Sequence, residues 1–184
     1  MLLVSGKEIK SSISMLEAID CVAKGFSDFN DGLFRMPQRT IMDIEGATVL
    51  TMPSYRKDGE YFVIKVVTVF DQFSIKKDKM VDSSVLVFDS KNGNLLAKLD
   101  GDSITAIRTG AASGIATKYF SSPLSEVLAI FGTGVQALTQ VEAVISCRPI
   151  KKVFVYSRNV KSAKRFSDHI HNFCLLYTSP SPRD

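Results

Sequence analysis

Apolar residues between Leu16 and Phe29 recur every three or four positions, which is the period of an amphipathic helix with one buried face. The apolar positions of this predicted helix are Leu16, Ile19, Val22, Ala23, Phe26 and Phe29. Ser14 and Glu17 have the spacing of a capping box, in which each side chain binds a backbone amide of the other residue. Asn30–Gly32 is a typical stop signal, so we expect the helix to end there.

The chain then changes to short runs of β-branched and aromatic residues, which predict strands. The predicted strands cover residues 40–44, 48–52, 61–70, 84–88 and 95–99. Turn residues at Lys57–Gly59 and Lys91–Asn94 punctuate these runs. The pattern therefore predicts a strand-rich region after the first helix.

Helical periodicity returns between residues 103 and 120. One side of this predicted helix consists of small residues, which let another backbone come close. They are Ala106, Gly110, Ser113 and Gly114. The sequence Ser121–Pro123 closes the helix.

The last part of the chain predicts a βαβ unit. Residues 127–131 read as a buried strand, and a glycine turn separates them from a helix over residues 135–146. A second strand over residues 152–156 and a helix beginning near Val160 follow. The crossover between the two strands demands a parallel sheet.

Composition narrows the class of protein. The chain has 184 residues, of which 45% are hydrophobic and 23% are charged, as in soluble globular proteins. Its net charge of +4 is weak evidence for nucleic acid or a membrane surface as a partner. Three cysteines without a C-x-x-C pair indicate neither a disulfide framework nor a zinc site. With no signal peptide or membrane-spanning run, we expect a cytoplasmic protein.

Length conflicts with the fold that the βαβ unit predicts. A doubly wound dinucleotide domain needs two such halves, and the residues after Val127 suffice for the first alone. We therefore expect an α/β protein whose Rossmann-type domain is truncated. Its expected parts are an α+β domain over residues 1–122, the start of the Rossmann domain over residues 123–173, and a tail over residues 174–184 that resembles translated adapter sequence.

The glycine turn has the pattern Gly132-x-Gly134-x-x-Ala137 between a strand and a helix, which favours dinucleotide binding. Gly132 permits the tight turn, Gly134 leaves room for a pyrophosphate, and Ala137 allows close packing of helix and strand. Backbone amides at the helix N-terminus then face the phosphate charge. A flavodoxin-like turn that binds no dinucleotide is the alternative.

The residues after the second strand bear on which nicotinamide cofactor binds. An acidic residue there would accept a hydrogen bond from the ribose 2′-hydroxyl, but this chain has Ser157, Arg158 and Asn159. The arginine offers a fork of donors to a 2′-phosphate and the serine adds a hydroxyl. The sequence therefore favours NADP(H), with NAD(H) possible. Alternatively, Arg158 simply faces solvent.

Lys65 lies within the apolar run of residues 61–70, where both faces of the predicted strand are apolar. The strand is therefore expected to be central and buried. A buried ammonium is costly unless it is paired or its pKa falls, and a lysine of lowered pKa is a natural proton shuttle. Alternatively, its stem lies on the sheet and its head reaches water.

Two arginines are candidates for binding a carboxylate. Arg39 follows Pro37 and precedes a strand, and Arg108 lies among small and apolar residues one turn into the helix of residues 103–120, which suggests a cavity beside it. Together they would suit a carboxylate through bidentate pairing. Singly, each is more often a surface residue.

His169, His171 and Cys174 have spacing reminiscent of metal ligands but lack a partner pair. We interpret them as a solvated helix end and expect no metal site.

The segment of residues 104–119, together with Gly132–Ala137, resembles the ornithine cyclodeaminase/mu-crystallin family. Pro37-x-Arg39, Lys65 in its apolar strand and the turn at Asp100–Gly101 fit the same pattern. The resemblance extends over residues 1–173. It implies a homodimer whose first domain carries the substrate pocket and the subunit contact, a Rossmann domain that binds NAD(H) or NADP(H), and a C-terminal segment that returns to complete the first domain.

The resemblance also implies roles for individual residues. Arg39 and Arg108 would hold the carboxylate of the substrate, and Lys65 would transfer a proton beside its nitrogen. Residues expected at the cofactor are Ser84, Arg108, Gly132, Thr133, Gly134, Val135, Gln136, Ser157, Arg158 and Asn159. Ser84 stands where the family has a threonine near the nicotinamide. The family's catalytic aspartate lies beyond residue 184, which puts activity of this chain alone in doubt.

Three functions fit these residues. The 2′-phosphate interpretation favours a reductase that uses NADPH on cyclic ketimine carboxylates. The alternatives are an ornithine cyclodeaminase, a lyase that forms proline and ammonia without net cofactor use, and a non-catalytic protein that binds NADPH. In each, the expected partner is a small amino or imino acid rather than nucleic acid or a membrane.

Overall fold

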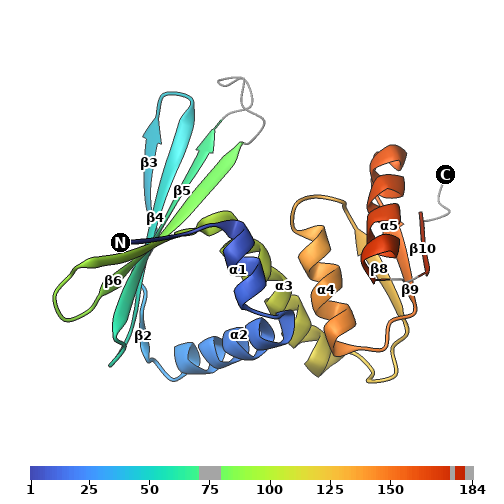
Figure 1. The fold of residues 1–184 in the computed structure, drawn as a ribbon, viewed down its shortest axis with the longest axis horizontal. Coiled ribbons are helices and arrows are strands. Elements are labelled where there is room, and N and C mark those ends of the chain that lie inside the picture. The colour runs from blue at the N-terminus through green and yellow to red at the C-terminus, as the bar shows by residue number, and fades with distance from the viewer. Residues whose placement is uncertain (71–79, 175–176, 181–184) are drawn as a thin grey trace. The chain divides into compact units, whose positions relative to one another are not determined.

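The computed structural model describes residues 1–70, 80–174 and 177–180, and the chain divides into two compact units that we describe separately (Figure 1). Unit 1 comprises Met1–Ile13 and Lys24–Thr105, and unit 2 comprises Ser14–Ala23 and Ala106–Asp184. The division falls inside two helices, α2 (Met15–Asn30) and α3 (Gly101–Phe120), and not at residue 122.

Unit 1 is built on a seven-stranded sheet in the order β1-β7-β6-β5-β4-β2, with β3 paired to β4. The strands are β1 (Leu2–Val4), β2 (Phe34–Arg35), β3 (Thr40–Ile44), β4 (Ala47–Arg56), β5 (Tyr61–Phe70), β6 (Val81–Asp89) and β7 (Leu95–Asp100). All pairs are antiparallel except β1 with β7. The five predicted strands are confirmed, whereas β1, β2 and helix α1 (Gly6–Ser12) were not predicted.

The central position predicted for β5 is confirmed, because it pairs with β4 on one side and β6 on the other. The predicted burial is only partly right. Val67 is buried, most other residues of the strand are half-buried, and Tyr61 is exposed. The sheet is therefore partly open to solvent at this strand. Phe62 of β5 stacks on Phe88 of β6, with ring centroids 4.8 Å apart.

Helix α2 begins with the predicted capping box, since Ser14 N donates to Glu17 Oε2 over 2.8 Å and Glu17 N donates back to Ser14 Oγ. The prediction of its buried face is wrong at three positions. Leu16, Phe26 and Phe29 are about half exposed, whereas Met15, Ala18 and Ile19 are buried. The hydrophobic period locates a helix, but the burial of each side chain depends on what packs against the helix.

Unit 2 contains the predicted βαβ unit, with strands β8 (Val127–Phe131) and β9 (Lys152–Tyr156) parallel to each other. Helix α4 (Ala137–Cys147) connects them, and α5 (Val160–Cys174) follows. Strand β10 (Tyr177–Pro180) pairs parallel to β9, which makes a three-stranded sheet in the order β10-β9-β8.

The core of unit 2 lies on one face of this sheet. It consists of Val141, Ile150, Val153, Val155, Ala163 and Ile170. Leu128 and Ile130 of β8 pack against it, whereas Val127 and Phe131 are exposed. The prediction that β8 is buried is therefore wrong for three of its five residues, which are exposed, because α4 and α5 both pack on the same face of the sheet.

The small side of α3 allows close packing within unit 2, as predicted. A Cβ on Gly110 would lie 2.4 Å from the carbonyl oxygen of Thr139, and one on Gly114 would lie 2.5 Å from Ile19 Cδ1. These contacts explain why most of α3 clusters with α4 and with the first part of α2.

In the tail, residues 175–176 and 181–184 lie outside the described residues. Its expected origin as adapter sequence stays a prediction. None of the helices described combines the length and the apolar character needed to cross a membrane.

Candidate functional site

The glycine turn of unit 2 lies at the C-terminal ends of the parallel strands. Gly132 has a φ of +100°, which favours glycine, and its amide donates to the carbonyl of Tyr156 over 2.8 Å. This bond ties the turn to the end of β9. A Cβ on Gly134 would meet no atom within 4 Å, so that side of the turn is open.

The start of α4 leaves backbone amides unpaired. Within the described residues, the amides of 133–136 donate to no backbone carbonyl, and Gln136 provides no side-chain cap. The first bond of this turn runs from Ala137 N to the carbonyl of Gly134 over 2.9 Å. Unpaired amides at a helix N-terminus favour an anion, which the helix dipole also attracts.

The end of β9 lies beside this turn. The hydroxyls of Thr133 and Ser157 are 3.5 Å apart, so the structure brings these two predicted residues together. Arg158 is exposed and has no ion pair within the described part of the chain. Asn159 has a local role, since its Oδ1 accepts from Ser162 N over 3.1 Å at the start of α5.

The turn fits a dinucleotide on chemical grounds. Gln136 Oε1 is buried without a hydrogen-bond partner, and Gln136 lines a hollow with Gly132 and Gly134. A buried carbonyl oxygen needs a donor. A dinucleotide brings ribose hydroxyls that can donate to it and phosphate oxygens that can accept from the free amides.

Lys65 of β5 contacts the start of α3 within unit 1. Its Nζ donates to Thr105 Oγ1 in the first turn of α3, and Thr105 Oγ1 donates to the carbonyl of Gly101 over 2.6 Å. In the β4–β5 register Lys65 is directly opposite Met52, so the two side chains share a face of the sheet.

Arg39 lies in the segment between β2 and β3 and is exposed. It lines a surface hollow together with Pro37, Met52 and Pro53. Met52 is also the cross-strand neighbour of Lys65 in the β4–β5 register. The expected convergence of Arg39 and Lys65 on one substrate stays a prediction.

Two other predicted residues lie elsewhere. Ser84 pairs with Val66 of β5, whereas Lys65 pairs with Val85, so Ser84 and Lys65 lie on opposite faces of the sheet. Arg108 is exposed on α3 in unit 2 and does not line the hollow at the glycine turn. Sequence reasoning missed Thr105, although a hydroxyl in the first turn of the helix that carries Arg108 was a usable signal.

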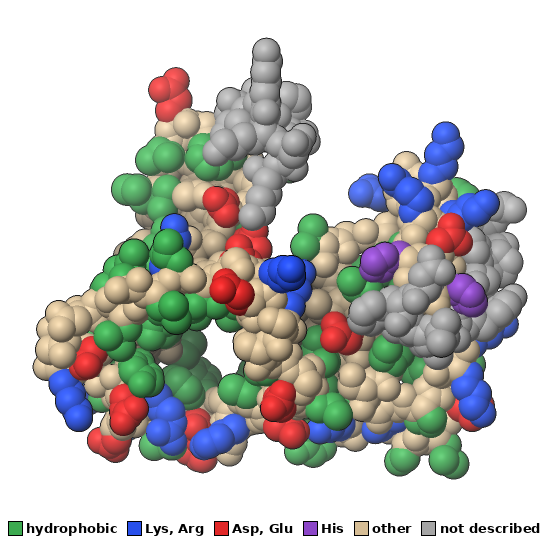
Figure 2. All heavy atoms as spheres, viewed as in Figure 1, with side chains coloured by type: hydrophobic (Ala, Val, Ile, Leu, Met, Phe, Trp, Pro, Cys, Tyr) green, Lys and Arg blue, Asp and Glu red, His purple; other side chains and the backbone are tan. Residues whose placement is uncertain are grey.

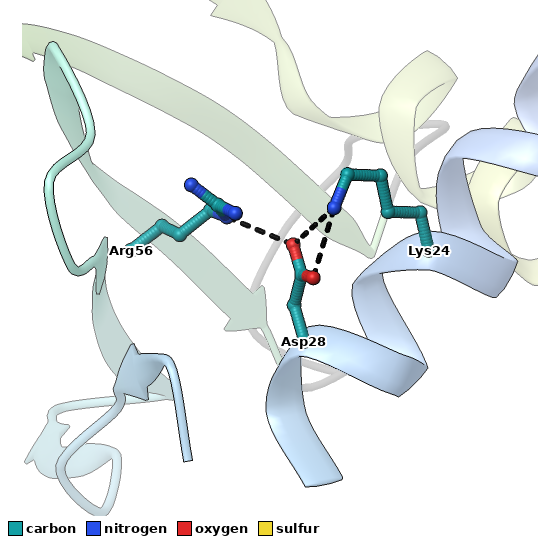
Figure 3. Close-up of polar contacts among 3 residues, drawn as sticks. All are labelled: Lys24, Asp28 and Arg56. Atoms are coloured by element: carbon teal, nitrogen blue, oxygen red, sulfur yellow. Dashed lines mark hydrogen bonds and ion pairs between the residues drawn. The ribbon is translucent and has the colours of Figure 1, made fainter. Parts of the chain in front are cut away.

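An ion-pair cluster of unit 1 joins α2 to the end of β4 (Figure 3). The carboxylate of Asp28 accepts from Lys24 Nζ over 2.9 Å and from Arg56 Nε over 2.8 Å. The hydrogen bond from Lys24, followed by that from Arg56, holds the pKa of Asp28 below its ordinary value. This cluster is a structural contact.

No group of three His, Cys, Asp or Glu residues in the described ranges could hold a metal ion.

The sequence matches known proteins over most of its length. The sequence model of the ornithine cyclodeaminase/mu-crystallin family matches residues 1–176. A Δ1-pyrroline-2-carboxylate reductase of Bacillus cereus is 35% identical over 178 residues, which cover 92% of this chain and 53% of that protein.

Two solved structures are similar in both fold and sequence. Δ1-pyrroline-2-carboxylate reductase of Thermococcus litoralis, in complex with NADH and L-proline, has a TM-score of 0.89 and 39% identity, covering 98% of this chain and 57% of that one. An archaeal alanine dehydrogenase dimer with bound NAD has a TM-score of 0.88 and 30% identity, covering 99% and 56%.

The chain thus spans about half the length of the curated relatives that it matches. The matched range contains the glycine turn and the positions of Lys65, Arg39 and Arg108. The expected fold class, a mixed α/β protein with a Rossmann-like unit, is confirmed by these neighbours. The chain belongs to the ornithine cyclodeaminase/mu-crystallin family.

Proposed function

We propose that the protein is a nicotinamide-dependent reductase of cyclic imino acids of the pyrroline-2-carboxylate type, with a preference for NADP(H). The observation that carries the proposal is the open, uncapped glycine turn with its free amides and the unpartnered oxygen of Gln136. Two of the reported relatives are Δ1-pyrroline-2-carboxylate reductases, and their names support the substrate class.

Residues of unit 2 hold the cofactor in this proposal. The amides of Thr133, Gly134 and Val135 bind the pyrophosphate, and Gln136 Oε1 accepts from a ribose hydroxyl. Arg158 and Ser157 pair with the 2′-phosphate. When bound, the reduced nicotinamide supplies the hydride that adds to the imine carbon. Ser84, which lies across the sheet from Lys65, stays a prediction as a cofactor residue.

The substrate is held through its charged groups. Arg39, which lines a surface hollow of unit 1, pairs with the carboxylate in this proposal. Arg108 stays a prediction as a second carboxylate-binding arginine. Lys65 passes a proton to the ring nitrogen as the imine becomes an amine. After this transfer the neutral amine of Lys65 keeps two N–H groups, so it can still donate hydrogen bonds.

We also propose that the protein is a homodimer joined through unit 1. Figure 2 shows hydrophobic side chains spread over the drawn face of the unit 1 sheet. Ile41, Met42 and Ile44 of β3 are exposed hydrophobic residues of this unit. Exposed apolar surface on a strand is a hazard unless another surface covers it. Sedimentation velocity on the full-length protein tests this, and a monomer at micromolar concentration would contradict it.

Substrate turnover tests the proposed reaction. The full-length protein is incubated with Δ1-pyrroline-2-carboxylate and NADPH, and separately with ornithine. We expect oxidation of NADPH that depends on the cyclic imino acid. Ammonia release from ornithine without net cofactor change would instead identify a cyclodeaminase. Tight binding of NADPH with no turnover of either compound would identify a binding protein.

A further inference from the structure

We infer that Thr105 is a positioning residue for Lys65, on the basis of the proposed function in which Lys65 transfers the proton. The hydroxyl of Thr105 accepts a hydrogen bond from Lys65 Nζ while it donates its own proton to the carbonyl of Gly101. Nothing in the sequence pattern alone assigned a role to Thr105.

The direction of these two bonds determines what Thr105 does. A hydroxyl has a single proton, and Thr105 donates it in a hydrogen bond to the carbonyl oxygen of Gly101, which lies 2.6 Å from Oγ1. Only the lone pairs of Thr105 Oγ1 then face Lys65, so Thr105 is an acceptor toward the lysine. Both the ammonium and the neutral amine have N–H groups, so either form of Lys65 can keep this bond.

This arrangement orients the proton that moves. When Lys65 is neutral, its nitrogen lone pair cannot point at Thr105, because an N–H occupies that direction. The lone pair therefore points in another direction, and so does the proton that binds to it when the ammonium forms. A lysine stem is flexible and its ordering is entropically costly, so a fixed acceptor near the head group reduces the number of unproductive conformations.

The acceptor is itself held in place. Gly101 is buried, and a Cβ there would lie 2.6 Å from backbone and side-chain atoms of Ser83, so the start of α3 packs directly on β6. Ser83 Oγ donates to Asp102 Oδ1 over 2.6 Å, and Ser103 N donates to Asp100 Oδ1 over 2.8 Å. The carbonyl of Gly101 is therefore anchored to the sheet that carries Lys65.

A second threonine of α3, Thr117, shows what a hydroxyl with a purely structural role looks like. Thr117 Oγ1 donates to the carbonyl of Ser113 over 2.8 Å, which is the same bond to the preceding turn. No lysine is recorded as a donor to that hydroxyl within the described residues. Thr117→Val therefore removes an equivalent bond and serves as the matched control.

The experiment compares Thr105→Val, which keeps the shape and removes the hydroxyl, with Thr105→Ser, which restores it. In the full-length protein we expect Thr105→Val to lower kcat by about tenfold to a hundredfold, part of the factor that a positioned proton donor contributes. KM should change less than about twofold, because the substrate contacts remain. Thr105→Ser and Thr117→Val should stay within about threefold of wild type in kcat.

A second readout does not depend on turnover. The Lys65 ammonium is followed by nitrogen-15 NMR, with Lys65→Met to assign the signal. We expect faster proton exchange at Lys65 in Thr105→Val but not in Thr105→Ser or Thr117→Val. Should Thr105→Val fail to fold, as judged by circular dichroism, Thr105→Ala replaces it.

Unchanged kcat together with an unchanged Lys65 signal in Thr105→Val would overturn the inference. A loss of activity that Thr105→Ser does not restore would also overturn it. If the wild-type protein turns over no cyclic imino acid, the proposed function fails, and the NMR comparison still decides whether the hydroxyl of Thr105 holds Lys65.

Discussion

Gly110 and Thr139 are in direct contact, because a Cβ on Gly110 would lie 2.4 Å from the backbone carbonyl oxygen of Thr139. The neighbour is backbone, so it cannot move aside as the end of a flexible side chain could. The packing of α3 on α4 in unit 2 therefore depends on the absence of a side chain at this position.

Gly110→Ala should lower the free energy of unfolding by about 1–3 kcal/mol, the usual cost of overpacking a core. The control is Gly25→Ala on α2, where a Cβ would meet nothing within 4 Å. That substitution should stabilise the chain by about 0.5–1 kcal/mol, since alanine is the better helix former. Urea denaturation of both variants checks the pair, and equal effects would contradict the contact.

Asp28 makes unit 1 sensitive to acid. Its pKa is lowered from an ordinary value of 3.8 by hydrogen bonds from Lys24 and Arg56, so its contribution is complete above that value and disappears as the pH falls through the lower, folded-state pKa. In Asp28→Asn, thermal melts between about pH 3 and pH 6 should depend less on pH. Some acid dependence should remain, because Ser14 lowers the pKa of Glu17. A wild-type pH profile in Asp28→Asn would show that the ion pair contributes nothing.

Arg148 closes the C-terminal end of α3. Its guanidinium donates to the carbonyls of Thr117 over 2.7 Å and Lys118 over 2.9 Å, and to Ser121 Oγ over 2.9 Å. Arg148→Ala should lower the free energy of unfolding by about 1–3 kcal/mol, because it removes these hydrogen bonds to the last turn of α3. Arg148→Lys should restore only part of this stability, since the lysine side chain lacks the planar fork of donors of a guanidinium.

Hydrogen exchange followed by mass spectrometry checks the location of this effect. In Arg148→Ala, exchange should rise in the peptide that contains the last turn of α3. Arg165→Ala is the control, because Arg165 is exposed and its contact with Ser162 is long, at 3.5 Å. Increased exchange spread evenly over unit 2 would argue against a local cap.

Arg158 should decide cofactor preference. It is exposed at the end of β9 without an ion pair in the described residues, so its guanidinium is available to a 2′-phosphate. Arg158→Ala should weaken NADPH binding by about tenfold or more, the worth of one charge-assisted contact, and leave NADH binding nearly unchanged. Lys161→Ala, at a neighbouring exposed cation of α5, is the control. Fluorescence titrations measure the affinity for each cofactor. An equal loss of affinity for NADPH and NADH in Arg158→Ala would refute the preference.

Local patterns predicted the elements well, and nonlocal packing accounts for the differences. The strands over residues 61–70 and 152–156 have the predicted bounds because each is a continuous apolar run. Helix α1 was missed, although Ser5 and Glu8 form a capping box, because it is only seven residues long.

Burial and side-chain contacts were harder to predict. Phe26 and Phe131 are exposed despite their apolar patterns, because burial depends on segments distant in the sequence. The contact between Lys65 and Thr105 was missed for the same reason, since it joins residues 40 positions apart. Only the pairing of β5 and β6 and the start of α3 on that sheet bring the two together.

Calorimetric titration of NADPH into the wild-type protein and Gly134→Val tests most directly whether the glycine turn holds the cofactor. A Cβ at Gly134 would meet no protein atom within 4 Å, so we expect the variant to fold normally while its isopropyl group fills the space that the pyrophosphate needs. We predict binding to the wild-type protein and at least about a tenfold loss in the variant, with unchanged thermal unfolding. Equal affinities, or no binding to the wild-type protein, would contradict the proposed site.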